Sequence, residues 1–313
     1  MSRSPAILLV LLLLGIGNPG RAQVTGTNTT IADAFLATGS AGNPDGSDLT
    51  GLNFGGAGTL AISPPSALKG EFQSVIRFNL SNTIALFNTN YGAGLWTITN
   101  ISLRLTSNYG IAGVQPNNPI FNFISGGQFV IEWLADDDWV EGTGTPNLPT
   151  MDGVTYSSLP VLLAQTHVPL CTNNYVPSGN NVPVTWVLPL ETNLLQNVAA
   201  GGDVNFRFYA ADNQVGYLFN SYFYGRGNQP LILVTAILTP VPVKILAGYF
   251  TNSVFHLTAQ GGSNLVYQVQ VSYDLETTNW QSLGPVTADT NGLVQFDDAA
   301  TAGHPERFYR LSR

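Results

Sequence analysis

The chain is poor in charge and in cysteine. Charged side chains make up 10% of its 313 residues, whereas about 25% is usual for a soluble domain. Cys171 is the only cysteine, which excludes a framework of internal disulfides. The chain also lacks long stretches rich in Glu, Lys and Ala, and this absence argues against coiled coils and helical repeats. Asn, Thr, Ser and Gln must therefore solvate most of the surface.

The charges that are present are mostly negative. The formal net charge is -8 at pH 7, so the chain lacks the basic surface that nucleic acids and anionic membranes require. We therefore expect neither of them as a partner. Apolar residues at 44% and aromatic residues at 11% exclude a disordered chain.

Residues 1–22 have the pattern of a signal peptide. Arg3 precedes an apolar run over Ile7–Ile16, and small residues lead to Ala22, after which we predict cleavage. The run is shorter than the roughly 20 apolar residues that span a bilayer. We therefore expect an exported protein, secreted or held at the cell surface, without a membrane span once the signal peptide is removed.

Residues 23–238 consist of short runs of Val, Ile, Phe, Tyr and Thr bounded by Gly, Asn and Pro, which is typical of strands and turns. The clearest predicted strands are Ser74–Leu80, Trp96–Thr106, Gly127–Leu134, Val182–Leu190, Asp203–Ala210 and Pro230–Ala236. In Asp203–Ala210 apolar and polar residues alternate, which predicts one face toward the core and one toward solvent. Helical signals are weak and lie in Ser81–Asn88 and Glu191–Ala199. We predict an all-β fold, a jelly-roll-like antiparallel β-sandwich.

A second, smaller β-sandwich-like domain is predicted in residues 239–313. Pro240 and Pro242 stand at alternate positions just after a predicted strand, and proline cannot serve in the middle of a sheet, so we interpret this segment as a short, stiff linker. The predicted strands beyond it are Ser253–Ala259, Leu265–Tyr273, Trp280–Thr287, Leu293–Asp297 and Arg307–Leu311. Between two of them, Asp289–Gly292 predicts a hairpin with a type I′ turn.

Several motifs of the first domain are typical of a known family. They are Gly70–Ser81, Ile101–Leu105, Trp139–Gly144, Asp152–Tyr156, Phe208–Asp212 and Tyr217–Ser221. Together they resemble the DNRLRE-type β-sandwich domain, a secreted bacterial family often carried by proteins with a PEP-type sorting tail. The resemblance implies placement outside the cell, and relatives of that domain have been grouped with carbohydrate-binding modules. It attaches no catalytic residue to these motifs.

The end of the chain departs from that family. It has neither the Val-Pro-Glu-Pro signature nor the apolar helix and arginine cluster that usually follow it. Its last segment, which contains Tyr267–Leu275, Asn279-Trp280 and Arg307–Leu311, is instead similar to a C-terminal module found on many exported proteins of Verrucomicrobia-like bacteria. This likeness also implies placement outside the cell and no chemistry.

The sequence offers few groups for catalysis. His167, His256 and His304 stand far apart without zinc-binding spacing, and no Gly-x-Ser-x-Gly motif is present. The acids Asp136–Asp138, Glu141 and Asp152 provide the residue type that glycoside hydrolysis needs, but a solvated loop explains them equally. We expect a protein that is not an enzyme and requires no cofactor.

Glu141 has a structural interpretation as well. It directly precedes Gly142-Thr143-Gly144, and we expect its carboxylate to accept hydrogen bonds from the amides of that turn.

A structural calcium ion is predicted at one loop. Asn43, Asp45 and Asp48 place three oxygen-bearing side chains within six residues, which suits the flexible oxygen shell of Ca²⁺. The spacing is not that of an EF-hand. Asx turns explain the same residues without an ion, so both interpretations stay open.

Aromatic residues suggest a binding activity. A sugar ring stacks on an exposed aromatic side chain while polar groups bind its hydroxyls. In an extended Tyr222-Phe223-Tyr224-Gly225-Arg226 segment, successive side chains point to opposite faces, so at least one ring should face outward. We therefore predict Tyr222, Tyr224, Arg226 and Trp139 as ligand-binding residues.

Two hypotheses for the function follow. The first is a non-catalytic extracellular protein that binds polysaccharide through its first β-sandwich. The alternative is a structural protein of the cell envelope or matrix that has no specific ligand. An enzyme acting on glycans would need a carboxylate pair that the sequence does not display.

Overall fold

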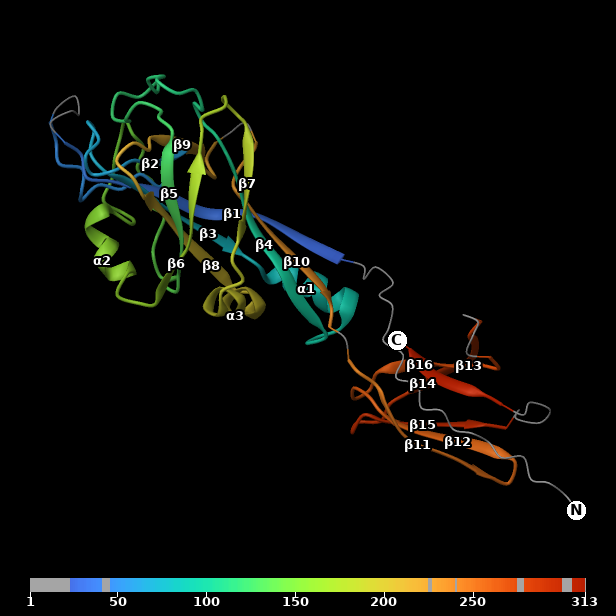
Figure 1. Ribbon diagram of the computed structural model, residues 1–313. Helices are drawn as coiled ribbons and strands as arrows, with labels where there is room; N and C mark the ends of the chain where they lie inside the picture. Colours follow the sequence, from blue (N-terminus) through green and yellow to red (C-terminus); the bar gives the residue numbers. More distant parts are fainter. Residues whose placement is uncertain are drawn as a thin grey trace, which may run out of the picture. The chain divides into compact units, whose positions relative to one another are not determined.

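The computed structural model describes residues 23–40, 46–224, 227–239, 241–274, 279–299 and 306–312. These residues form two compact units that meet in the sequence between Leu238 and Thr239. Strands β1–β10 and the helices belong to the first unit, and strands β11–β16 belong to the second (Figure 1). The predicted fold class, antiparallel β-sandwich, is confirmed, because all paired strands are antiparallel.

The described residues of the first unit form ten strands and three α-helices. The strands are β1 (Gln23–Ala37), β2 (Thr59–Ile62), β3 (Phe72–Asn79), β4 (Trp96–Thr106), β5 (Gly127–Leu134), β6 (His167–Tyr175), β7 (Pro183–Leu188), β8 (Asp203–Ala210), β9 (Tyr217–Asn220) and β10 (Leu231–Leu238). The helices are α1 (Ser81–Tyr91), α2 (Leu159–Leu162) and α3 (Thr192–Ala200), with a short 3₁₀ helix at Tyr156–Ser158.

Strand β1 connects the two layers of the sandwich. Eight strands follow the order β6-β5-β8-β3-β1-β10-β4-β7. The first half of β1 pairs with β10, the second half pairs with β3, and an irregularity between Thr30 and Ala32 separates the halves. Such a bulge bends a strand and increases its twist. The outermost strands β6 and β7 also meet, since the ring centroids of Tyr175 and Trp186 are 6.0 Å apart, so the sandwich is nearly a barrel.

The main core lies between these two layers. It contains apolar residues of β4 and β10, such as Ile101 and Val234, together with those of β5 and β8, such as Ile131 and Phe206. Both predicted helices are present. In α3, Glu191 caps the first turn by accepting hydrogen bonds from two backbone N–H groups, and Gly201, with φ of 76°, ends the helix.

One sequence-based expectation about β8 was wrong. Val204, Phe206 and Phe208 face the core as predicted, but Asn205 and Arg207 on the opposite face are buried rather than solvated. The reason is a third layer, in which side chains from residues 139–162 pack against this outer face of the sheet. Their cluster comprises Trp139, Val154, Leu159 and Leu162, together with Ala32, Ala34, Leu36, Val75 and Leu134 of the sheet.

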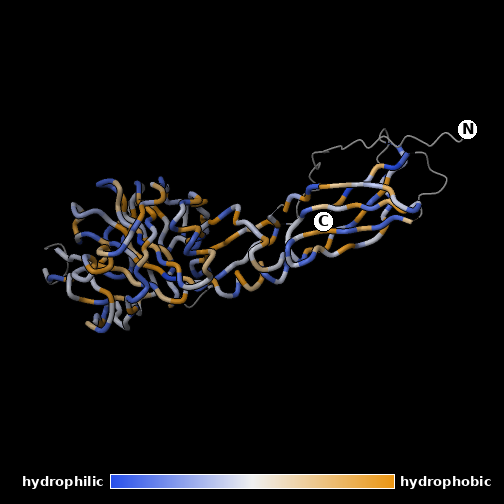
Figure 2. The backbone as a smooth tube through the Cα atoms, turned by 90° about the horizontal axis from the view of Figure 1, so that it is seen from below, coloured by the Kyte–Doolittle hydropathy of each residue, from blue (hydrophilic) through white to orange (hydrophobic). Residues whose placement is uncertain are grey.

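The second unit consists of two three-stranded sheets. Their strands are β11 (Lys244–Thr251), β12 (Val254–Gln260), β13 (Val266–Ser272), β14 (Gln281–Thr287), β15 (Leu293–Asp298) and β16 (Phe308–Ser312). One sheet has the order β11-β12-β15 and the other β14-β13-β16. Hydrophobic and hydrophilic positions alternate along these strands (Figure 2). Residues of both sheets, such as Leu257 and Val269, share one core.

The predicted hairpin in this unit was wrong in part. A tight turn forms, because the Gly292 N–H donates to the Asp289 carbonyl at 3.0 Å. However, β14 pairs with β13 and β15 pairs with β12, so the turn carries the chain from one sheet to the other. Gly292 supplies the positive φ of 80° just after the turn, as in three-residue loops rather than in a type I′ turn.

Candidate functional site

An open groove of about 650 Å³ lies on the outer face of the first unit's sheet. The sheet contributes Gln73 of β3 and Arg207 of β8, which are neighbouring strands. The third layer contributes the segment around α2. In full, the groove is lined by Thr50, Gln73, Tyr156, Ser157, Leu159, Pro160, Leu163 and Arg207. The groove therefore combines an apolar wall with hydroxyl, amide and guanidinium groups.

Gln73 is a polar residue of the groove whose hydrogen bonding is incomplete. The residue is 7% exposed, and its Nε2 donates to Glu71 Oε1 at 2.7 Å. The Tyr156 hydroxyl donates to the other oxygen, Glu71 Oε2, at 2.6 Å. The Gln73 Oε1 atom is shielded from water and has no hydrogen-bond partner. An unpaired buried acceptor costs about 1–3 kcal/mol of folding free energy, so the stability of the fold does not explain why Gln73 stands at this position.

Arg207 lies in a buried charge cluster beside Gln73. It is 8% exposed, and its Nε is 2.8 Å from Glu132 Oε2 of β5. The two atoms form a close ion pair but not an aligned hydrogen bond. Arg207 Nε therefore remains a donor without a hydrogen-bond partner, and Glu132 Oε2 remains an acceptor without one. The other Glu132 oxygen is 3.0 Å from His167 Nδ1. The guanidinium carbon also lies 4.3 Å from the centroid of the Tyr209 ring, which is a cation–π contact.

The two phenols near the groove remain protonated at neutral pH. Burial, together with the hydrogen bond that Tyr156 donates to the negatively charged Glu71 carboxylate, raises the pKa of Tyr156 to about 12. Burial and the Glu132 charge raise the pKa of Tyr209 in the same way. Tyr156 is thus a hydrogen-bond donor to Glu71, and its ring forms part of the groove wall.

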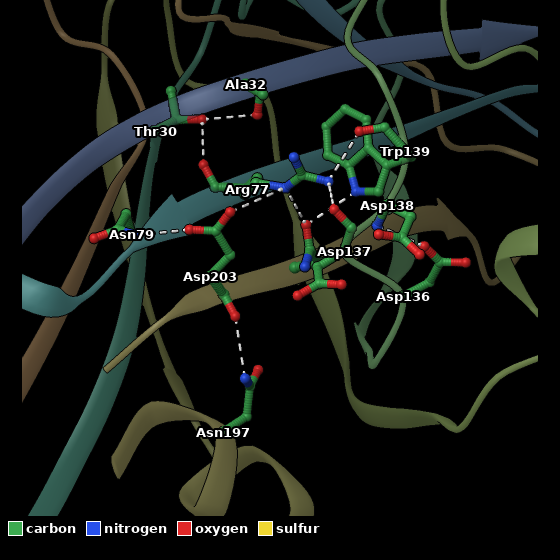
Figure 3. A network of polar contacts seen from close by, with 11 residues as sticks. Thr30, Ala32, Arg77, Asn79, Asp136, Asp137, Asp138, Trp139, Asn197 and Asp203 are labelled. Carbon is green, nitrogen blue, oxygen red and sulfur yellow. Dashed lines mark hydrogen bonds and ion pairs between the residues drawn. The ribbon is translucent and has the colours of Figure 1, made fainter. Parts of the chain in front are cut away.

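Trp139, a predicted ligand-binding residue, lies inside the third layer. The residue is 6% exposed, and its Nε1 donates to Asn205 Oδ1 at 2.9 Å. Arg77 of β3 lies over the indole ring, 4.5 Å from its centroid. Arg77 also donates to the carbonyls of Asp137 and Trp139 and to Asn205 (Figure 3). Trp139 therefore anchors residues 136–141 to the sheet.

The turn after Trp139 is held by Asn53 and Asp152 rather than by Glu141, the residue expected from the sequence. Glu141 does not bind the Gly142–Gly144 amides, because its Oε1 accepts a hydrogen bond from the Asp33 N–H at 2.7 Å. Asn53 accepts from the Gly144 N–H at 3.1 Å. The expectation for Glu141 was wrong because its actual partner is 108 residues away in β1, which local spacing does not reveal.

Two other acids of this region, Asp152 and Asp136, also have structural partners. Asp152 accepts hydrogen bonds from the Thr143 N–H and from the Thr143 and Thr150 hydroxyls, and these bonds lower its pKa to about 2. The Asp138 N–H donates to Asp136 Oδ1 at 3.0 Å, which is an Asx turn. A carboxylate held ionised at pKa 2 is a poor general acid at neutral pH.

The predicted aromatic segment forms a turn and not an extended strand. The Tyr224 N–H donates to the Ser221 carbonyl at 3.2 Å, so alternation of side chains between two faces does not apply. Tyr222 is 40% exposed and Phe223 is 49% exposed, and their rings meet edge to face at 5.2 Å. The Tyr224 hydroxyl donates to Asn181 at 3.1 Å. Arg226 lies outside the described residues.

A buried carboxylate holds this turn. Asp33 of β1 is 1% exposed, and its Oδ2 accepts a hydrogen bond from the Tyr222 N–H at 2.6 Å. Burial raises the pKa of Asp33 well above its ordinary value, and the nearby Glu141 charge raises it further. Burial likewise raises the pKa of Glu141. Asp33 thus connects the first strand, the turn after Trp139 and the aromatic turn, defined as residues 221–224.

The predicted calcium loop is described only in part. Asn43 and Asp45 lie outside the described residues. Asp48 is exposed, and its Oδ1 accepts a hydrogen bond from the Thr50 N–H at 2.9 Å, as in an Asx turn. Within the residues that the structure covers, no three His, Cys, Asp or Glu side chains cluster as a metal site would require. Calcium at residues 43–48 stays a prediction.

The groove itself was missed from the sequence, although a signal existed. Gln73 and Tyr156 stood in motifs that resembled a known family, but no ligand role was given to them. Basic residues are few in this chain, which has 11 Lys and Arg. Arg207 in the middle of an alternating strand therefore indicates that the polar face of this strand contacts another group. Cys171 lies half-buried in β6, where burial raises the pKa of its thiol.

The chain matches no protein-family model and no curated protein. Among solved structures, a Ruminococcus gnavus β-glucuronidase is similar over 96% of this chain and 46% of that chain, at 9% identity and a TM-score of 0.22. A β-glucuronidase from an uncultured Clostridium sp. is similar over 96% of this chain and 44% of that chain, at 9% identity and a TM-score of 0.23. The chain thus spans less than half the length of these enzymes. Similarity at this level shows neither a shared fold nor a shared activity.

No helix in the described part of the chain is both long and apolar enough to cross a bilayer.

Proposed function

We propose that this protein is exported and that its first unit binds a polysaccharide in the groove without cleaving it. The observation that carries the proposal is the lining of the groove, in which apolar residues around α2 lie beside the polar residues Gln73 and Arg207. Ligand sites combine an apolar lining with a few polar groups that fix orientation. A sugar ring supplies hydroxyl groups for polar side chains and C–H faces for an apolar wall.

The lining of the groove suits a sugar better than a purely apolar ligand. Leu159, Pro160 and Leu163 form the apolar part, and Tyr156 adds an aromatic ring. Thr50 and Ser157 add hydroxyl groups that both donate and accept hydrogen bonds. The open form admits a chain that continues beyond the sugar bound in the groove. Ligand sites commonly combine such an apolar lining with a few polar groups that fix orientation.

A binding role without catalysis is favoured by the partners of the carboxylates. Glu71 accepts from Tyr156 and Gln73, and Glu132 faces Arg207 and His167. Asp152 is kept ionised by Thr143 and Thr150, as described above. A glycosidase needs one carboxyl group as a proton donor and a second across the scissile bond, and these acids are instead used in structural contacts. Export rests on the signal-peptide pattern of residues 1–22.

Isothermal titration after a glycan-array screen tests the proposal. Gln73→Met keeps the length of the side chain but removes the amide, and we expect it to weaken binding of the best polysaccharide at least tenfold. Gln128→Met is the matched control, because Gln128 is an exposed residue of β5 that does not line the groove. If no glycan binds the wild-type protein, the binding proposal is wrong, and regular assembly seen by electron microscopy would favour the structural alternative.

A further inference from the structure

We propose that two copies of this protein pair through strand β11 of the second unit. In this dimer the two β11 strands run antiparallel and join the sheets to which they belong into one continuous sheet. The inference is independent of polysaccharide binding, because it rests on residues of the second unit alone.

Strand β11 lies at the end of its sheet, so one side of it has no neighbouring strand among the described residues. The backbone N–H and C=O groups on such a side can pair with another chain. An irregularity between Ile245 and Ala247 is followed by five regularly paired residues, Ala247–Thr251. The side chains here are open to solvent, since Tyr249 is 55% exposed and Phe250 is 42% exposed.

The other end strands of the second unit carry features that disfavour pairing. β14 contains Pro285, β15 ends with Asp297 and Asp298, and β16 contains Arg310. Proline and charged side chains are common means of protecting an edge. The one charged residue of β11 is Lys244, at its first position. The regular part of β11 is therefore an uncharged edge without such protection.

Each face of β11 offers an aromatic ring at this edge. Opposite residues of paired strands share a face, so Phe250 lies on the core face with Phe255, and Tyr249 lies on the outer face with His256. The Phe250 and Phe255 rings are 5.4 Å apart, yet Phe250 is largely exposed, so the sandwich does not fully cover its core at β11. The Tyr249 ring stacks on His256 with centroids 4.9 Å apart, which leaves the opposite face of the ring for a further partner.

A second copy fits this edge because the segment is complementary to itself. An antiparallel pair centred on Tyr249 uses all five residues, with Gly248 opposite Phe250 of the second copy and Ala247 opposite its Thr251. Each Phe250 then covers a glycine position beside the open margin of the core. The two Tyr249 residues meet at the strand spacing of about 4.8 Å, which suits a continued ring stack. A shift by one residue would place core-face side chains opposite outer-face ones.

Charge does not oppose this pairing. Lys244 lies outside the paired segment, and the two copies of Lys244 lie toward opposite ends of the antiparallel pair. Residues 239–313 carry six acidic and four basic side chains, so two second units repel each other only weakly. A strongly charged partner would find no complementary charge along Ala247–Thr251. A second copy is therefore the partner that this uncharged edge favours.

Sedimentation velocity of the chain without residues 1–22, over a micromolar to submillimolar series, tests the inference. We expect a dimer whose population rises with concentration. Tyr249→Lys places two positive charges directly opposite each other, which destabilises strand pairing, so it should weaken dimerisation at least tenfold. Val266→Lys is the matched control, because Val266 is 50% exposed but lies in β13, which already has a neighbouring strand on both sides. Melting temperatures are recorded for all variants.

Cysteine cross-linking tests the register and does not depend on the lysine variant. In a Cys171→Ser background, Tyr249→Cys brings two thiols opposite each other at a Cα separation of about 4.5–5.5 Å, which suits a disulfide. Thr251→Cys is the control, because Thr251 is also an exposed residue of β11 but its two copies lie about 13 Å apart along the strands. Air oxidation should therefore cross-link Tyr249→Cys and not Thr251→Cys.

The outcomes decide between this dimer and its alternatives. A wild-type protein that stays monomeric at every concentration would overturn the inference. A dimer that Tyr249→Lys leaves intact would also overturn it, because the interface would then lie elsewhere. Equal cross-linking of Tyr249→Cys and Thr251→Cys would contradict the pairing centred on Tyr249. These results do not bear on polysaccharide binding by the first unit, so the two proposals can fail separately.

Discussion

Replacement of Trp139 tests the third layer that forms the groove. The indole is buried, donates to Asn205 Oδ1 at 2.9 Å and lies 4.5 Å from the Arg77 guanidinium carbon. Truncation of a buried Trp to Ala costs about 3–5 kcal/mol. For a unit of this size, 1 kcal/mol shifts the melting temperature by about 2–4 °C, so Trp139→Ala should lower it by roughly 6–20 °C.

Trp139→Phe separates packing from the hydrogen bond. Phe keeps most of the ring but loses the N–H donor, while Asn205 Oδ1 still accepts from Arg77 Nε at 3.0 Å. We therefore expect a loss of only about 1–2 kcal/mol, close to that of one hydrogen bond plus some packing. The exposed Phe223→Ala is the control and should change the unfolding free energy by about 0.5 kcal/mol or less.

Intrinsic fluorescence during urea unfolding measures these effects on the first unit. Four of the five Trp residues lie in residues 23–238, so the signal reports mainly on that unit in the intact chain. A Trp139→Ala variant as stable as the wild-type protein would refute the burial of Trp139 and with it the anchoring of residues 136–141 to the sheet.

Three further predictions concern other parts of the first unit. Burial raises the pKa of Asp33 above its ordinary value of 3.8, so ionisation of Asp33 opposes folding as the pH rises from about 4 through the raised pKa. Asp33→Asn should therefore be more stable than the wild-type protein at pH 7 but not at pH 3. An equal difference in unfolding free energy between the two proteins at both pH values would contradict this. EDTA is expected to lower the melting temperature and Asp45→Asn to abolish that response, whereas an unchanged melt would leave Asp48 with its Asx turn alone. Tyr222→Ala should weaken retention on polysaccharide by roughly 1 kcal/mol without a change in melting temperature, and a large loss of stability would show that the ring belongs to the core.

The strands that the sequence predicted correctly are those with a simple burial pattern. Predicted bounds for β4, β5 and β8 agree with the structure, because these strands carry clear apolar runs or alternation. β1 was missed, since the second half of it is buried on both faces and so loses its alternation. β6 was missed because it contains Pro169 and a polar Asn173-Asn174 pair, which an edge strand tolerates.

The candidate site was harder to predict, because its parts meet only through long-range contacts. Alternation in β8 shows that Arg207 lies on a polar face, but not that residues 139–162 cover this face. Trp139 looked like a binding aromatic for the same reason: its partner Asn205 is 66 residues away in sequence. Local patterns therefore indicated which residues share a face, while their burial depended on the third layer.

Blocking the groove tests the central claim most directly. Ser157 is exposed and lines the groove, so Ser157→Trp should fill the groove without disturbing the core. Ser66→Trp is the matched control, because Ser66 is also exposed but does not line the groove. In titrations with the polysaccharide that binds the wild-type protein most tightly, we predict that Ser157→Trp reduces affinity at least tenfold and that Ser66→Trp leaves it unchanged. Equal affinity of Ser157→Trp and the wild-type protein would show that polysaccharide does not bind in the groove.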